Sequence, residues 1–206
     1  MNAIWVWGAA LLIYAAFYLW YNGLRRPLTP QEIDAYVKRL HESTVETTPE
    51  LLQTMRSFLE SDDGGEYFMV NLVRVSPGMV RGPGDDSARP AREVLERYTR
   101  HFMPALLRRG GHPALIVMRA GGYVEHWGVE ADPAWSFAGL IRYRSRRDMM
   151  ELVLDPRFAQ AHLFKKAAIE RTFAFPARLA LMTFGPRIVV ALAIALIAAV
   201  FHLVLK

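Results

Sequence analysis

The sequence predicts an α+β domain placed between two membrane-spanning helices. Three observations lead to this prediction. Each end of the 206-residue chain carries a long apolar segment without an acidic, lysine or arginine side chain. The residues between them are about as many as one ordinary domain contains. Within that stretch, runs rich in β-branched and aromatic residues alternate with runs whose apolar residues recur at helical spacing.

The first apolar segment extends from Ala3 to Tyr21, and its nineteen residues carry no charge. A helix of that length is about 28 Å long, close to the thickness of the hydrocarbon core. Aromatic rings gather toward its ends, as at the headgroup level, and Arg25 and Arg26 follow. A cleaved signal peptide is the alternative, but no basic residue precedes the run. We therefore predict a lasting transmembrane anchor at residues 1–24.

The second apolar segment extends from Ile188 to Leu205 and is interrupted only by His202. Its eighteen residues would form a helix of about 27 Å. A buried helix of a soluble core is the alternative, but such a helix in a small domain keeps a polar face, and this run has none. We predict a transmembrane helix at residues 187–206.

Basic residues are unevenly distributed around the two predicted spans. Four arginines flank them on the domain side, and only Lys206 and the free amine lie on the other. The positive-inside rule then predicts an inner (cytoplasmic) membrane protein with two spans, a cytoplasmic domain and both termini outside. The formal net charge is +5. The domain's arginines lack a recognition-helix pattern and interleaved aromatics, which argues against nucleic acid and favours an anionic lipid surface.

Residues 25–65 are acidic, with nine acidic and three basic residues between Gln31 and Glu66. The segment Thr29–Glu32 has the form of a capping box with proline at the first helical position. A second helix is expected to begin at Thr48 and to end at Asp62–Gly65. We expect these two helices to form a separate acidic neck.

The elements predicted for residues 66–183 follow the order β-α-β-β-α-β. That order is typical of the ferredoxin-like fold, in which helices cover one sheet face and the other needs a partner. A second copy would supply it in a dimeric α/β barrel, so we expect a homodimer. The predicted elements are a strand at Tyr67–Val75, a helix at Val94–Arg109, strands at Pro113–Val124 and Ala134–Tyr143, helices beginning at Ser145 and Asp155, and a strand at Thr172–Leu181.

Five separated pieces of the domain carry a resemblance to a known family: Val70–Leu72, Gly110–Gly111, Ile141–Ser145, Asp155–Phe158 and Ala167–Glu170. With them, the stretch from about Tyr67 to Pro176 resembles the "domain of unknown function 1330" family of the dimeric α/β-barrel superfamily. The resemblance implies the same fold and the same dimerisation. The two anchors and the neck lie outside it.

A more distant resemblance concerns the haem-degrading and antibiotic-biosynthesis-type monooxygenases of that superfamily. Their site holds an asparagine on the first strand, a tryptophan ending the third and a histidine on the following helix. Asn71, Tyr143 and His162 occupy the similar positions here, with tyrosine in place of tryptophan. The resemblance implies that these residues are catalytic and, if haem is the cofactor, that His162 is its metal ligand. Tyr98–His101 resembles the first helix of those enzymes.

Each candidate residue also has an ordinary structural explanation. His162 shares a helical face with Phe158 and Lys165, so it lies either in a pocket or in the core, bonded to the backbone. Arg142 could bind a carboxylate or phosphate bidentately, or lie on an exposed strand face or in an inter-subunit pair. With Tyr98 and His101, it completes the candidate ligand-binding set. An inward-facing Asn71 would need partners for its amide.

We therefore expect a membrane-anchored dimeric α/β-barrel protein that binds a small apolar or haem-like molecule at the cytoplasmic membrane face. Whether it is an enzyme stays open at this point. One alternative is a haem or small-aromatic monooxygenase. Another is an accessory subunit of a membrane complex, with alanines in the second span that permit close helix approach. The chain has no cysteine, so disulfides, thiolate metal sites and cysteine nucleophiles are excluded.

Overall fold

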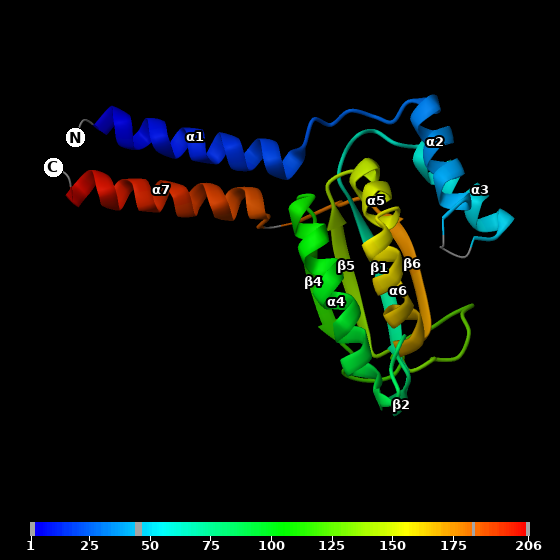
Figure 1. The fold of residues 1–206 in the computed structure, drawn as a ribbon. Coiled ribbons are helices and arrows are strands. Elements are labelled where there is room, and N and C mark those ends of the chain that lie inside the picture. Colours follow the sequence, from blue (N-terminus) through cyan, green and yellow to red (C-terminus); the bar gives the residue numbers. More distant parts are fainter. Residues whose placement is uncertain (1–2, 44–46, 183, 205–206) are drawn as a thin grey trace. The chain divides into compact units, whose positions relative to one another are not determined.

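The structure is a computed structural model that describes residues 3–43, 47–182 and 184–204. It divides into two compact units, one made of the two end segments and the other of Arg25–Arg178. The α+β class is confirmed, since the described chain contains seven helices and an antiparallel sheet. Figure 1 shows the order of the elements along the chain.

The end segments form two helices, α1 (Ala3–Asn22) and α7 (Pro186–Val204). Their mean hydropathies are 1.5 and 2.5, and both are long and apolar enough to cross a membrane by length and composition. Arg187 joins them, because its Nε donates to Oδ1 of Asn22 over 2.8 Å and its guanidinium lies 4.9 Å from the Tyr21 ring centroid. Most other side chains of the pair are apolar and exposed.

The main sheet has four antiparallel strands in the order β4-β5-β1-β6. These strands are β1 (Tyr67–Val75), β4 (His112–Met118), β5 (Phe137–Tyr143) and β6 (Ile169–Ala177). The central strands pair Tyr67 with Tyr143 and Asn71 with Gly139. Because neighbouring residues of a strand point to opposite faces, Asn71, Gly139 and Tyr143 share one face. A two-stranded ladder, β2 (Met79–Val80) and β3 (Arg89–Pro90), precedes the first covering helix.

Three helices lie on one face of the sheet: α4 (Ala91–Arg108), α5 (Arg146–Val153) and α6 (Pro156–Ala168). Figure 1 shows α4 and α6 side by side in front of the strands.

Ser145 and Asp155 cap α5 and α6 by accepting hydrogen bonds from Asp148 N and Arg157 N, which confirms both predicted helix starts. A core cluster joins α4 to α5 and α6 through Phe102, Leu106, Leu152 and Ala161, among others.

Three predicted strands differ in their limits from the observed ones. β5 begins at Phe137, not at Ala134. β4 ends at Met118, not at Val124, because the Arg119 side chain bonds to the Gly121 carbonyl (2.6 Å) and to Asp132 (2.6 Å) and so closes a loop. β6 starts at Ile169, directly after α6, and ends at Ala177. Its Pro176 is accommodated because β6 is an edge strand.

The expected neck does not stand apart from the domain. Its helices are α2 (Pro30–His41) and α3 (Pro49–Glu60), and the capping box at Thr29 and Glu32 is present. Their apolar faces share a core cluster with β1 and α5, which contribute Tyr67, Met149 and Met150. Residues 25–65 therefore belong to the compact unit that contains the sheet.

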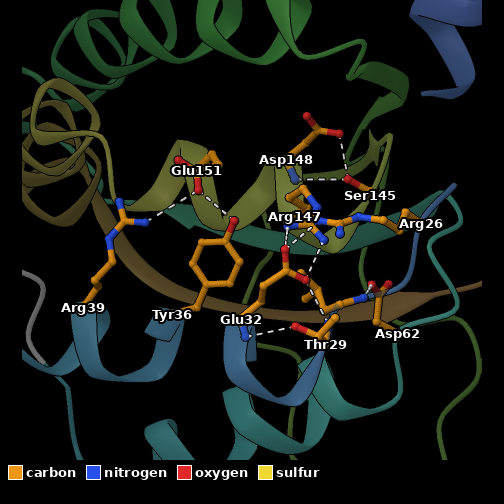
Figure 2. A network of polar contacts seen from close by, with 11 residues as sticks. Arg26, Thr29, Glu32, Tyr36, Arg39, Asp62, Ser145, Arg147, Asp148 and Glu151 are labelled. Atoms are coloured by element: carbon orange, nitrogen blue, oxygen red, sulfur yellow. Dashed lines mark hydrogen bonds and ion pairs between the residues drawn. The ribbon is translucent and has the colours of Figure 1, made fainter. Parts of the chain in front are cut away.

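Polar contacts complete the attachment of α2 to α5 (Figure 2). Oxygens of Glu32 lie 2.6 Å from Arg26 and 2.7 Å from Arg147. Tyr36 donates a hydrogen bond to Glu151 over 2.7 Å. The hydrogen bond from Arg147, more than any other interaction, lowers the pKa of the Glu32 carboxyl from 4.5 to about 2. The acidic surface of α2 thus pairs with arginines within its own unit.

Glu32→Gln is expected to lower the stability of the full chain at pH 7 by about 1 kcal/mol, since the pair is partly exposed. The folded-state pKa lies below the unfolded one, so this stabilisation is present above about pH 4.5 and is lost as the pH falls toward about 2. The melting temperatures of the wild type and Glu32→Gln in detergent, compared between about pH 2 and pH 7, measure this difference in stability. Glu42→Gln is the control, because Glu42 is exposed and 3.9 Å from Lys38. A wild-type advantage that did not shrink in acid would contradict the pairing.

Candidate functional site

A cavity of about 310 Å³ lies between the sheet and the helices α4 and α6. Its volume is at the small end of the range of roughly 300–1,000 Å³ found for ligand pockets. The lining is mainly apolar, and the described residues that form it include no carboxylate. The helices contribute Leu95, Tyr98, Thr99, Phe102, Met103 and Lys165, and the sheet contributes Asn71, Val73, Pro113, Ile116, Phe137, Gly139, Ile141, Tyr143 and Ile169.

Gly139 keeps the sheet side of this cavity open. It lies on β5 opposite Asn71 of β1 and Ile116 of β4. A Cβ atom at this position would have only the Ile116 Cδ1 within 4 Å, at 3.0 Å. A longer side chain here would therefore extend into space that is now empty.

Three polar side chains named in the sequence analysis line the cavity: Asn71, Tyr98 and Tyr143. The Asn71 amide nitrogen donates to the Met69 carbonyl over 2.9 Å and makes a longer contact of 3.4 Å with the Gly139 carbonyl. These bonds satisfy the nitrogen and leave its Oδ1 available as an acceptor. Burial raises the pKa of both tyrosine hydroxyls, so they stay neutral donors at physiological pH.

His162 lies on α6 but is not among the residues that line the cavity. Its ring centroid is 6.2 Å from that of Tyr98 and 5.7 Å from that of Phe158. In the described structure its Nδ1 is buried and has no hydrogen-bond partner. Burial, with the nearby charges of Lys165 and Lys166, lowers the pKa of His162 to about 4. The imidazole is therefore neutral at pH 7 and packs behind an aromatic side chain of the cavity.

The cavity does not fit a haem. An axial histidine needs a nitrogen that faces the space occupied by the macrocycle, and His162 lies outside the cavity lining. A tetrapyrrole with its propionates also needs more room than a cavity of about 310 Å³. The expectation that His162 is a haem-iron ligand is therefore not supported by its position. Asn71 and Tyr143 retain their place in the site without it.

Arg142 and His101 do not line this cavity. Arg142 points away from the cavity, is 1% exposed and places its Nε 2.6 Å from Glu66. It also donates to the Gly110 carbonyl, so it joins the turn after α4 to the start of β1. His101 is exposed on α4, with its Nδ1 2.8 Å from the Arg97 carbonyl. These positions indicate a structural role for Arg142 and a surface position for His101.

The opposite face of the sheet is apolar and open within the described domain. Phe173 and Phe175 of β6 are each 47% exposed and their rings stack, with centroids 6.2 Å apart. Leu115 and Val117 of β4 are 50% and 44% exposed. Register places Val70, Leu72 and Leu140 on the same face. An exposed apolar patch of this kind marks an interaction surface.

Comparison with known proteins supports the fold only. No family model and no curated protein match the chain. Two solved structures resemble it, both of RPA0582, a protein of unknown function from Rhodopseudomonas palustris. One is 22% identical over 67% of this chain and 98% of that one, with a TM-score of 0.53. The methylated form is 23% identical over 69% and 98%, with a TM-score of 0.52.

Proposed function

We propose that the protein is a membrane-anchored small-molecule-binding protein whose site is the cavity between the sheet, α4 and α6. The observation that carries the proposal is this cavity of about 310 Å³, lined mainly by apolar side chains with a few polar groups among them. Such a lining is typical of sites for small, largely apolar ligands, with the polar groups fixing their orientation.

Binding of a neutral bicyclic aromatic amide, 2-naphthamide, tests this function. The full chain in lipid nanodiscs is titrated by calorimetry, with empty nanodiscs as the blank. Saturable binding of one molecule per chain is the expected result. Heat no larger than that of the empty nanodiscs would contradict the proposal.

The proposal includes a ferredoxin-like domain that dimerises as an α/β barrel. The order β4-β5-β1-β6 supports it, because the two central strands are the first and third of the four main strands along the chain. The resemblance to the domain of unknown function 1330 family points the same way. A second copy is the occupant that best suits the apolar open face, since such a face is self-complementary in a two-fold dimer.

Phe175→Asp is expected to convert the dimer into a monomer. A carboxylate buried between two apolar sheets has no partner, and the loss should weaken association by about 100-fold or more. Light scattering of the full chain in detergent gives the mass. Leu163→Asp is the matched control, because Leu163 is 48% exposed on α6, away from the sheet. A wild-type monomer, or a variant that stays dimeric, would contradict the interface.

The proposed location is the cytoplasmic face of a membrane, with α1 and α7 as its two spans. Exposed apolar side chains on both helices support this, because a helix in a soluble core would bury them. The arginines on the domain side of both spans favour a cytoplasmic domain. In that location the two spans tether the domain to a bilayer, in which apolar molecules concentrate.

A second candidate is a monooxygenase that acts on a small aromatic molecule without haem. Asn71 and Tyr143 line one cavity, as the resemblance to the monooxygenases implies. Consumption of dissolved oxygen that depends on an added aromatic substrate tests this candidate. No uptake with substrates that the protein binds would remove it and leave the binding function.

A further inference from the structure

Lys165 adds a cationic side chain to the mainly apolar lining of the cavity. It projects from α6, and its Nζ lies 5.8 Å from the centroid of the Tyr98 ring. Within the described part of the chain Lys165 has this ring contact but no hydrogen bond and no ion pair. Its near neighbours on the helix are Lys166, a second cation, and His162, which is neutral at pH 7. No carboxylate is present among the lining residues in the part of the chain that the structure describes.

A buried ammonium group is usually stabilised by an ion pair or hydrogen bonds, and Lys165 has neither among the described residues. Burial disfavours the charged form of Lys165 and so lowers the pKa of its amine. Contact with the face of Tyr98 compensates the charge less than an ion pair with a buried carboxylate would. A ligand with a negative group would supply the missing partner.

The other polar groups at the cavity suit the same kind of ligand. Tyr98 and Tyr143 each have a neutral hydroxyl that can donate, and neither hydroxyl has a partner among the described residues. With the ammonium of Lys165, three donors therefore line a space in which Asn71 Oδ1 is a free acceptor. A carboxylate has two oxygens that accept such bonds, and charge-assisted bonds of this kind are strong.

We propose that the ligand of this cavity is a small apolar molecule with a single carboxylate, and that Lys165 binds this carboxylate. This inference rests on the binding function proposed above and adds the chemical class of the ligand. The volume of about 310 Å³ holds a body of one or two rings or a short chain, and excludes an intact membrane lipid.

Two probes of the same shape and different charge test the inference. 2-Naphthoate carries a carboxylate where 2-naphthamide carries a neutral amide. Both are titrated into the full chain in lipid nanodiscs, with empty nanodiscs as the blank. We expect the wild type to bind the carboxylate at least about tenfold more tightly than the amide. Lys165→Met should weaken carboxylate binding at least about tenfold and change amide binding by less than about twofold.

Two controls separate charge at the cavity from other effects. Methionine keeps much of the volume of lysine and removes a buried charge, so Lys165→Met should fold, and its melting temperature checks this. Lys166→Met removes the adjacent, exposed lysine and should leave the carboxylate preference intact. Equal binding of both probes by the wild type, or a preference retained in Lys165→Met, would overturn the inference while the cavity function stands. Binding of neither probe would overturn both.

Discussion

Arg142→Ala is expected to destabilise the full chain by about 3–5 kcal/mol. The Arg142 side chain is 1% exposed, and its Nε lies 2.6 Å from a carboxylate oxygen of Glu66. The Glu66 side chain is 19% exposed. The same guanidinium donates to the Gly110 carbonyl at the end of α4. Truncation leaves both groups without this partner and opens a void at the end of the sheet. A loss of this size approaches the total stability of many domains.

Chemical denaturation of the full chain in detergent, followed by circular dichroism, measures this loss. Arg157→Ala is the control, because Arg157 is 85% exposed and 3.9 Å from Asp155, so it should cost less than about 0.5 kcal/mol. If Arg142→Ala were as stable as this control, Arg142 would not be a structural residue.

Gly139→Leu is expected to abolish binding of 2-naphthamide, with affinity reduced by about 100-fold or more. Gly139 faces α4 and α6 from β5, and an added Cβ meets only the end of the Ile116 side chain. The rest of a leucine side chain must occupy the cavity. Filling an apolar void and replacing a strand glycine both favour the folded state. The variant should therefore melt at or above the wild-type temperature.

Calorimetry in nanodiscs measures the binding, and thermal melting shows that the fold is retained. Gly121→Leu adds the same side chain to an exposed loop, where no atom lies within 4 Å of its Cβ position. It should bind the amide as the wild type does. Unchanged binding by Gly139→Leu would show that the probe binds elsewhere, and would contradict the assignment of the cavity as the site.

Local sequence signals predicted the elements of this fold well. The caps at Thr29, Ser145 and Asp155 each accept the hydrogen bond that their residue type predicts. The apolar end segments coincide with two long helices. These features depend on residues within a few positions of one another, so the sequence alone carries the information.

The contacts that decide the site were not predictable in the same way. The sequence pattern of a strand does not tell which face of the sheet is covered. Arg142 could therefore be predicted equally well to bind a ligand or to form an ion pair within the protein. Its partners Glu66 and Gly110 are 76 and 32 residues away. His162 and Lys165 lie one helical turn apart, and only tertiary packing decides that the lysine lines the cavity.

The docking of the neck was missed for a related reason. An excess of acidic residues over basic ones suggested that residues 25–65 form an acidic neck outside the sheet domain. In the structure, the pairs from Arg147 to Glu32 and from Tyr36 to Glu151 each join residues 115 positions apart. Charge counted within a segment does not show where its counter-charges lie. Arg147 of α5 carries the counter-charge for Glu32 of α2. No pattern among neighbouring residues in the sequence could connect the two helices.

In the proposed topology, both ends of the chain lie in a membrane and the domain lies in the cytoplasm. Because the chain has no cysteine, single-cysteine variants can be labelled with a membrane-impermeant maleimide in right-side-out vesicles. Lys206→Cys should be labelled in intact vesicles, and Ser87→Cys, exposed on the domain, only after lysis. Labelling of Ser87→Cys before lysis, or a protein that stays soluble without detergent, would contradict the account.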